Sequence, residues 1–226
     1  MAIKYNIMNQ LLFKFPFKTK YYEQDYYVSS NNFSAYRLIE SWPNWPDKWV
    51  NIYGPKGCGK THLSNILRKK INTTLIEDAK DIGNSTIQKF EKLDCLIIDN
   101  YDSNIDEKIL YLILNLSKQL DSYVVINSIL PIQDIKFELI DLKSRAQSFL
   151  ALGIELPTDD LLRVIISKSF SDKQIDINPK VSEFIIKNIE RSYEKVFKFI
   201  KEIDDLSLSS GKSININLIK KVLIDE

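Results

Sequence analysis

The chain has 226 residues, 44% of them hydrophobic, and a formal net charge of +1 at pH 7. This length suits one large domain or a medium domain with a small one, and the composition can bury an ordinary core. The balanced charge argues against a dedicated nucleic-acid binder, which usually presents a strongly basic face, while it leaves room for a local basic patch. Two cysteines, Cys58 and Cys95, are typical of a reduced cytosolic protein rather than of a disulfide framework.

The N-terminus lacks the pattern of a secretory signal, because Lys4, Gln10 and Lys14 interrupt its short apolar runs. No apolar stretch reaches the length of a transmembrane helix. We therefore expect a soluble, cytoplasmic protein with no membrane partner.

Residues 1–26 are expected to form a flexible tail, because Pro16 breaks regular structure and lysines are the only charges before Glu23. An apolar stretch at residues 10–16 stands within it. A helix is expected over residues 34–41, capped near Asn31 or Asn32. The two prolines of Trp-Pro-Asn-Trp-Pro at residues 42–46 then force an extended turn.

Residues 49–70 have the pattern of a strand, a glycine loop and a helix. Residues 49–53 are an apolar run, and residues 61–70 carry apolar side chains at helical spacing. Between them residues 54–61 read Gly-Pro-Lys-Gly-Cys-Gly-Lys-Thr, a complete G-x-x-x-x-G-K-[ST] phosphate loop. Such a loop brings backbone N–H groups and a positive helix end onto a phosphate.

We therefore expect ATP or ADP with Mg²⁺ to bind here. Lys60 would reach the β- and γ-phosphates, and the hydroxyl of Thr61 would lie on Mg²⁺. His62 follows on the helix, where packing or hydrogen bonding beside the nucleotide is favoured over catalysis. The expected nucleotide-binding residues of this segment are Gly54, Pro55, Lys56, Gly57, Cys58, Gly59, Lys60, Thr61 and His62.

Apolar strands and amphipathic helices alternate as far as residue 156. This alternation predicts an α/β core with a parallel sheet covered on both faces. Further strands are expected at residues 74–76, 93–99, 123–127 and 149–156, and helices within 78–91, 105–120 and 136–148.

From Pro157 the pattern changes to helices only, at residues 159–170, 179–189, 191–208 and 214–223. The change predicts a small helical domain of about 70 residues. The expected organisation is a tail at 1–26, a nucleotide-binding core at 27–156 and a helical domain at 157–226.

Three polar residues at strand ends extend the expected site. Asp99 closes an apolar strand and would hold Mg²⁺ through its water shell. Many such ATPases have a second carboxylate next, but this chain has Asn100, which cannot take a proton from water, so slow or absent intrinsic hydrolysis is expected. Asn127 could contact the γ-phosphate or the attacking water, and a strand-end Asn that only forms a turn is equally compatible.

Together these residues resemble the AAA+ superfamily, and within it the DnaA-related regulators of the Hda family, especially their alphaproteobacterial form. The resemblance covers nearly the whole chain and implies an AAA+ core followed by a helical lid. The pair Asp99-Asn100 is itself typical of Hda-like proteins. The matching segments are residues 10–16, Asn32, 42–46, 54–63, 96–100, 142–145 and 191–194.

The resemblance implies that residues 10–15 dock on the DNA polymerase III sliding clamp. Gln10 would hydrogen-bond the pocket rim, while Phe13 and Phe15 would fill apolar subsites where the family usually has leucine. Packing of this stretch on its own domain is the alternative. The implied clamp-binding residues are Gln10, Leu11, Leu12, Phe13 and Phe15.

Further roles follow from the same resemblance. Arg145, after Leu142-Lys143-Ser144, corresponds to an arginine finger offered in trans to ATP on a neighbouring subunit; without the resemblance, a surface ion pair is the simpler interpretation. Arg191 corresponds to the sensor II arginine that reaches the nucleotide phosphates from the lid. Tyr27 and Val28 are expected to line the adenine pocket.

The function implied is negative regulation of chromosome replication, by stimulating ATP hydrolysis on the initiator DnaA. Sequence-specific DNA binding is not expected, since DnaA continues into a helix-turn-helix domain where this chain ends. A homodimer is compatible with the sequence. One alternative is a DnaC-like helicase loader or autonomous AAA+ ATPase, and Asn100 argues against it. Another alternative is an adaptor that makes no catalytic contribution.

Overall fold

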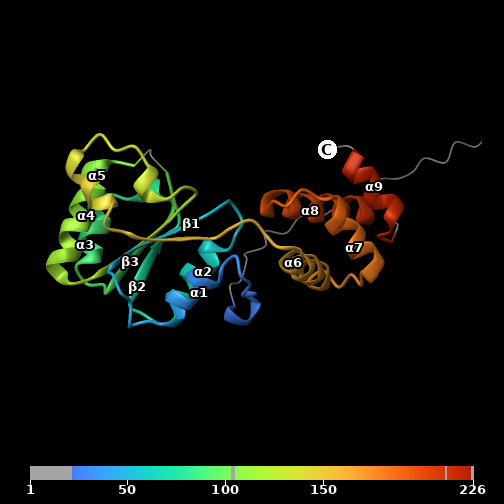
Figure 1. Ribbon diagram of the computed structural model, residues 1–226, viewed down its shortest axis with the longest axis horizontal. Coiled ribbons are helices and arrows are strands. Elements are labelled where there is room, and N and C mark those ends of the chain that lie inside the picture. Colours follow the sequence, from blue (N-terminus) through green and yellow to red (C-terminus); the bar gives the residue numbers. More distant parts are fainter. Residues whose placement is uncertain (1–21, 103–104, 212, 225–226) are drawn as a thin grey trace, which may run out of the picture. The chain divides into compact units, whose positions relative to one another are not determined.

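The computed structural model describes residues 22–102, 105–211 and 213–224 (Figure 1). They fall into two compact units, one ending at Leu156 and one beginning at Pro157. The clamp-binding stretch expected at residues 10–15 lies outside the described residues. In the part of the chain that the structure describes, no helix is both long and apolar enough to span a membrane.

The first unit is built on a five-stranded parallel sheet with the strand order β2-β3-β4-β1-β5. Parallel strands covered on both faces are mostly apolar, and the buried central strands of this sheet are apolar except at Asn51 and at the polar ends of β3 and β4. The strands are β1 (Trp49–Tyr53), β2 (Thr73–Ile76), β3 (Cys95–Tyr101), β4 (Tyr123–Ser128) and β5 (Leu150–Gly153).

Two groups of helices accompany the sheet. α1 and α2 pack against each other, and α4 packs against both α3 and α5. The helical elements are η1 (Glu23–Asp25), α1 (Phe33–Glu40), α2 (Lys60–Leu67), η2 (Ala79–Asp81), α3 (Asn84–Phe90), α4 (Glu107–Leu120), η3 (Ile132–Asp134) and α5 (Ile140–Ala146). The arrangement confirms the expected α/β class.

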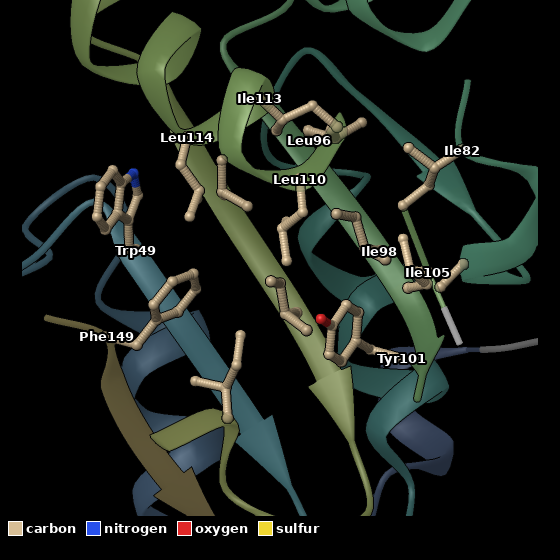
Figure 2. Packing of buried hydrophobic residues seen from close by; sticks show 14 of the residues in the cluster. Trp49, Ile82, Leu96, Ile98, Tyr101, Ile105, Leu110, Ile113, Leu114 and Phe149 are labelled. Atoms are coloured by element: carbon tan, nitrogen blue, oxygen red, sulfur yellow. The ribbon is translucent and has the colours of Figure 1, made fainter. Parts of the chain in front are cut away.

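The main hydrophobic core lies between α4 and the sheet. Figure 2 shows Leu110 and Leu114 of α4 directed at the strands, with Trp49 and Phe149 at one end of the cluster. Leu110 and Leu114 are fully buried. Burying one such side chain contributes about 1.5–3 kcal/mol, so this face of α4 anchors the helix on the sheet.

Strand β3 differs from the expected strand at residues 93–99, because it continues past Asp99 to Tyr101. Asn100 adopts a left-handed conformation with a φ of 50°, and the register with β4 shifts between Ile98 and Tyr101. The bulge arises because Asn tolerates this conformation better than most residues.

The second unit consists, in its described residues, of α6 (Asp159–Ser171), α7 (Pro179–Asn188), α8 (Tyr193–Ser210) and α9 (Ile216–Ile224). Local sequence sets their ends: the Thr158 hydroxyl and the Asn178 side chain cap α6 and α7, and Gly211 ends α8 with a φ of 63°. Phe170 and Phe199 are fully buried in the helical core.

Candidate nucleotide-binding site

The glycine loop between β1 and α2 has a backbone that side chains would obstruct. A Cβ at Gly54 would lie 2.5 Å from the carbonyl oxygen of Ile154, and one at Gly59 would lie 2.9 Å from the Tyr26 ring. Both glycines also have positive φ, 153° and 100°. Glycine is therefore needed at both positions for the loop to follow this path, in agreement with the glycines of the phosphate-loop motif.

Lys60 is the first residue of α2, and its side chain turns back onto the loop. Its ammonium donates to the carbonyl oxygens of Gly54 at 2.7 Å and Pro55 at 3.0 Å, and it lies 3.6 Å from the sulfur of Cys58. Burial raises the pKa of the Cys58 thiol, an effect that Lys60 opposes. The buried ammonium and the N-terminal end of α2 together make the loop a fitting site for an anion.

Asp99 is the centre of a hydrogen-bond network below the loop. Its carboxylate accepts from the Thr61 hydroxyl at 2.6 Å, from the Asn127 amide at 3.0 Å and from the backbone N–H of Asn100 at 3.0 Å. The Asp99 side chain is buried, with 1% of the residue exposed. A carboxylate held beside a hydroxyl offers the hard oxygen atoms that Mg²⁺ prefers, so the pair Thr61 and Asp99 fits a nucleotide-bound magnesium ion.

Asn127 connects this network to α2. Its Nδ2 donates both to Asp99 and to the Ser64 hydroxyl, the latter at 2.7 Å. Its Oδ1 is buried and has no hydrogen-bond partner among the described residues. The arrangement brings Asn127 to the site that Thr61 and Asp99 share.

The side chain of Asn100 points to Glu77 and does not join the network around Asp99. Its side-chain amide donates to the carbonyl oxygen of Glu77 at 2.8 Å, and the residue is exposed. In this conformation Asn100 acts on the turn after β2, while only its backbone N–H contacts Asp99.

An aromatic group that the sequence interpretation missed lies beside the loop. Tyr26 packs on Gly59, stacks on Tyr36 with ring centroids 5.7 Å apart, and meets the His62 ring edge-on at 5.2 Å. His62 Nε2 lies 2.7 Å from the Tyr22 carbonyl oxygen, so this nitrogen carries the hydrogen. His62 therefore packs and hydrogen-bonds at the start of α2.

Tyr27 and Val28, expected at the adenine pocket, follow in the same segment. Tyr27 is 44% exposed, and its carbonyl oxygen accepts from the Asn32 side chain at 2.9 Å. The ring that contacts Gly59 is that of Tyr26, and the place of Tyr27 and Val28 at the adenine pocket stays a prediction. No motif distinguishes these two adjacent tyrosines, so the sequence offers no signal for the choice.

Arg145 lies near the end of α5, where it is half-buried against α4. Its guanidinium donates to the Asn115 side chain and lies over the Tyr111 ring, 4.5 Å from the centroid. The Trp49 ring is 5.9 Å away. The expected finger thus contacts its own core and is not grouped with Lys60 and Asp99.

Arg191 precedes α8 in the helical unit and is exposed. It pairs with Asp159 through two hydrogen bonds, of 3.0 and 3.3 Å. The hydrogen bond from Arg191 lowers the pKa of the Asp159 carboxyl.

Comparison with known proteins finds similarity to DnaA and, in the helical unit, to the lid domain of Hda. Residues 159–223 match a family model described as "Hda, lid domain". Over 98% of its length the chain is 26% identical to the chromosomal replication initiator protein DnaA of Buchnera aphidicola, and over 77% it is 25% identical to DnaA of Chlorobaculum tepidum. These alignments cover 55% and 40% of the two initiators, so the chain spans about half the length of the curated relatives it matches.

Solved structures agree on the fold. Domain III of Thermotoga maritima DnaA has a TM-score of 0.74 at 20% identity, with 93% of this chain and 98% of that one covered. AMPPCP-bound DnaA from Aquifex aeolicus has a TM-score of 0.67 at 20% identity, with coverages of 86% and 68%. These likenesses confirm the expected AAA+ architecture.

Proposed function

We propose that the chain is a DnaA-related, Hda-like AAA+ protein that negatively regulates the initiation of chromosome replication in the cytoplasm. It binds ADP or ATP with Mg²⁺, is tethered to the DNA polymerase III sliding clamp, and stimulates hydrolysis of ATP held by DnaA. The observation that carries this proposal is the Hda lid match at residues 159–223 on a chain with a complete phosphate loop.

Nucleotide binding is supported by the geometry around Lys60. A bound phosphate would draw the buried Lys60 ammonium from the carbonyl oxygens of Gly54 and Pro55. The Thr61 hydroxyl and the Asp99 carboxylate would orient the magnesium ion and its water shell. The exposed amide of Asn100 supplies no base, so the nucleotide acts mainly as a structural ligand and intrinsic turnover is slow.

The activating group is Arg145, offered to the nucleotide on DnaA. An arginine supplied in trans stabilises charge that develops on the γ-phosphate and can raise hydrolysis by roughly 10³–10⁵. Arg191 contributes from the lid to this chain's own nucleotide. Gln10, Phe13 and Phe15 hold the clamp, which concentrates the protein where DNA is replicated.

The deciding experiment measures hydrolysis of radiolabelled ATP preloaded on the DnaA of the same organism. The reaction contains DNA-loaded clamp, with and without this protein. Stimulation that requires the clamp and is lost in Arg145→Ala and in Gln10→Ala supports the proposal. Stimulation that survives Arg145→Ala points to an adaptor without a catalytic contribution.

A helicase loader or autonomous ATPase remains the competing function, because it shares the AAA+ core. It predicts ATP turnover by this chain alone, stimulated by single-stranded DNA, and binding to a replicative helicase. Neither activity gives a role to residues 10–15. No effect on DnaA-bound ATP, together with such turnover, would replace the proposed function with this one.

A further inference from the structure

The guanidinium of Arg145 lies against Tyr111 and Asn115 of α4 and near Trp49 of β1. We call this docking position of the side chain its berth. Tyr111 and Asn115 lie one turn apart on α4, and the Arg145 guanidinium covers the first and donates to the second. The ring centroid of Trp49, in β1, lies 5.9 Å from the guanidinium carbon. A cation over an aromatic face is attracted by the ring quadrupole, and the attraction grows as water is excluded.

The backbone that carries Arg145 is fixed independently of this berth. The Glu107 carboxylate, at the start of α4, accepts from the backbone N–H of Glu138 at 3.0 Å and from that of Leu139 at 2.8 Å. These bonds hold the segment that leads into α5. A change of the Arg145 rotamer would leave these backbone hydrogen bonds intact.

One nitrogen of Arg145 indicates that the berth is not the working position. Nη1 is buried, and within the described part of the chain it has no hydrogen-bond acceptor. A phosphate cannot reach a nitrogen that is enclosed in this way. Since a buried unpaired donor is unfavourable, contact with an anion outside the berth would compensate for leaving the Tyr111 ring.

We propose that Tyr111 and Asn115 are positioning residues that hold Arg145 in its berth, and that Arg145 must leave the berth to act on a partner's nucleotide. The inference rests on the proposed function for its consequence in trans. Only the undocked fraction of the protein is then competent, so the apparent affinity for the initiator is reduced by that fraction. Weakening the berth should strengthen the action on the partner.

The berth itself is tested by a double-mutant cycle on unfolding, which needs no partner. Tyr111→Leu, Arg145→Ala and the double variant are unfolded in urea and followed by tryptophan fluorescence. The cavity left by Tyr111→Leu is common to both backgrounds and cancels in the cycle. Tyr111→Leu should lower the folding equilibrium constant in both backgrounds. We expect the factor to be about threefold larger when Arg145 is present than when it is replaced by alanine.

The consequence is tested by the concentration of this protein that gives half-maximal hydrolysis of ATP on DnaA. Asn115→Ala and Tyr111→Leu should lower that concentration by about three- to tenfold with the maximal rate unchanged. Asn115→Asp adds a negatively charged partner for Arg145 and should raise the half-maximal concentration. Tyr111→Phe keeps the ring and is the matched control, with wild-type behaviour expected.

The outcomes separate the docking of Arg145, the positioning role of Tyr111 and Asn115, and the proposed function. A cycle without coupling overturns the berth, whatever the hydrolysis assay gives. Equal shifts in Asn115→Ala and Asn115→Asp, or a fall in the maximal rate alone, overturn the positioning role. A wild-type chain that never stimulates hydrolysis sinks the proposed function, and the unfolding cycle then decides the berth by itself.

Discussion

Thr61 and Asp99, 38 residues apart in sequence, are joined by a hydrogen bond of 2.6 Å from the hydroxyl to the carboxylate. The strand order makes this contact understandable. β4 lies between β1, which leads into the phosphate loop, and β3, which carries Asp99. Asn127 of β4 therefore reaches both Asp99 and Ser64 of α2, and the three segments form one network.

The first prediction concerns the two lysines of the phosphate loop. Lys60 is buried and bonded to the loop carbonyls, whereas Lys56 is exposed. Lys60→Ala removes the ammonium that would face the phosphates and should weaken ADP binding at least tenfold, because charged hydrogen bonds contribute about 1.5–3 kcal/mol each. Titration with a fluorescent ADP analogue measures the effect.

Lys56→Ala is the matched control in the same loop. It removes the same charge from an exposed position, where water screens it, and should change the affinity less than threefold. Equal losses in the two variants would show that general positive charge, and not the Lys60 position, controls binding.

The strand, glycine loop and helix that frame the candidate phosphate site were largely predictable from sequence, and the surroundings of Arg145 and Tyr26 were not. A strand, a glycine loop and a helix at this spacing have one common three-dimensional form. By contrast, the contact of Tyr26 with Gly59 depends on a turn that Asn32 holds through the backbone of Tyr27 and Ser29. The berth of Arg145 depends on α4, whose side chains meet α5 only after both pack on the sheet.

The second prediction concerns Asn100→Glu, which would restore a carboxylate next to Asp99. Asn100 has a φ of 50° and bonds to the Glu77 carbonyl, so Glu would be strained and would meet an acceptor. We expect a loss of about 1–2 kcal/mol, hence a Tm lower by about 2–8 °C, and no gain in steady-state ATP hydrolysis.

Asn100→Gly separates strain from hydrogen bonding. Glycine adopts the left-handed conformation freely, so only the bond to Glu77 is lost and the fall in Tm should be smaller. A Glu variant that hydrolyses ATP much faster than the wild type would contradict the orientation described for this residue.

The third prediction tests the core of the helical unit with two phenylalanines of α8. Phe199 is fully buried and Phe197 is 45% exposed. Phe199→Ala should destabilise the helical unit by about 3–5 kcal/mol, because it leaves a cavity, whereas Phe197→Ala should change stability by less than about 0.5 kcal/mol.

Far-UV circular dichroism during urea unfolding is the suitable measurement for this pair. The three tryptophans, Trp42, Trp45 and Trp49, all lie in the unit that ends at Leu156, so their fluorescence does not report on α8 directly. Similar losses in the two variants would mean that the packing described for α8 is wrong.

The last prediction concerns the pH dependence of the pair formed by Asp159 and Arg191. The hydrogen bond from Arg191 lowers the pKa of Asp159 below its usual value of about 3.9. A depressed pKa contributes stability above the unfolded value, and this contribution is lost as the pH falls through the folded value. Arg191→Ala should return the Asp159 pKa toward its usual value in an NMR titration of the carboxyl carbon.

Arg163→Ala is the control for this titration, because Arg163 acts on Asp159 only through its charge, a smaller cause than the bond from Arg191. It should leave most of the Asp159 shift intact, while the pKa of its own partner Glu183 rises. Repeating the wild-type titration with ADP and Mg²⁺ tests the proposed role of Arg191 at the phosphates. If Arg191 leaves Asp159 for the nucleotide, the Asp159 pKa rises; an unchanged pKa with bound ADP contradicts that role.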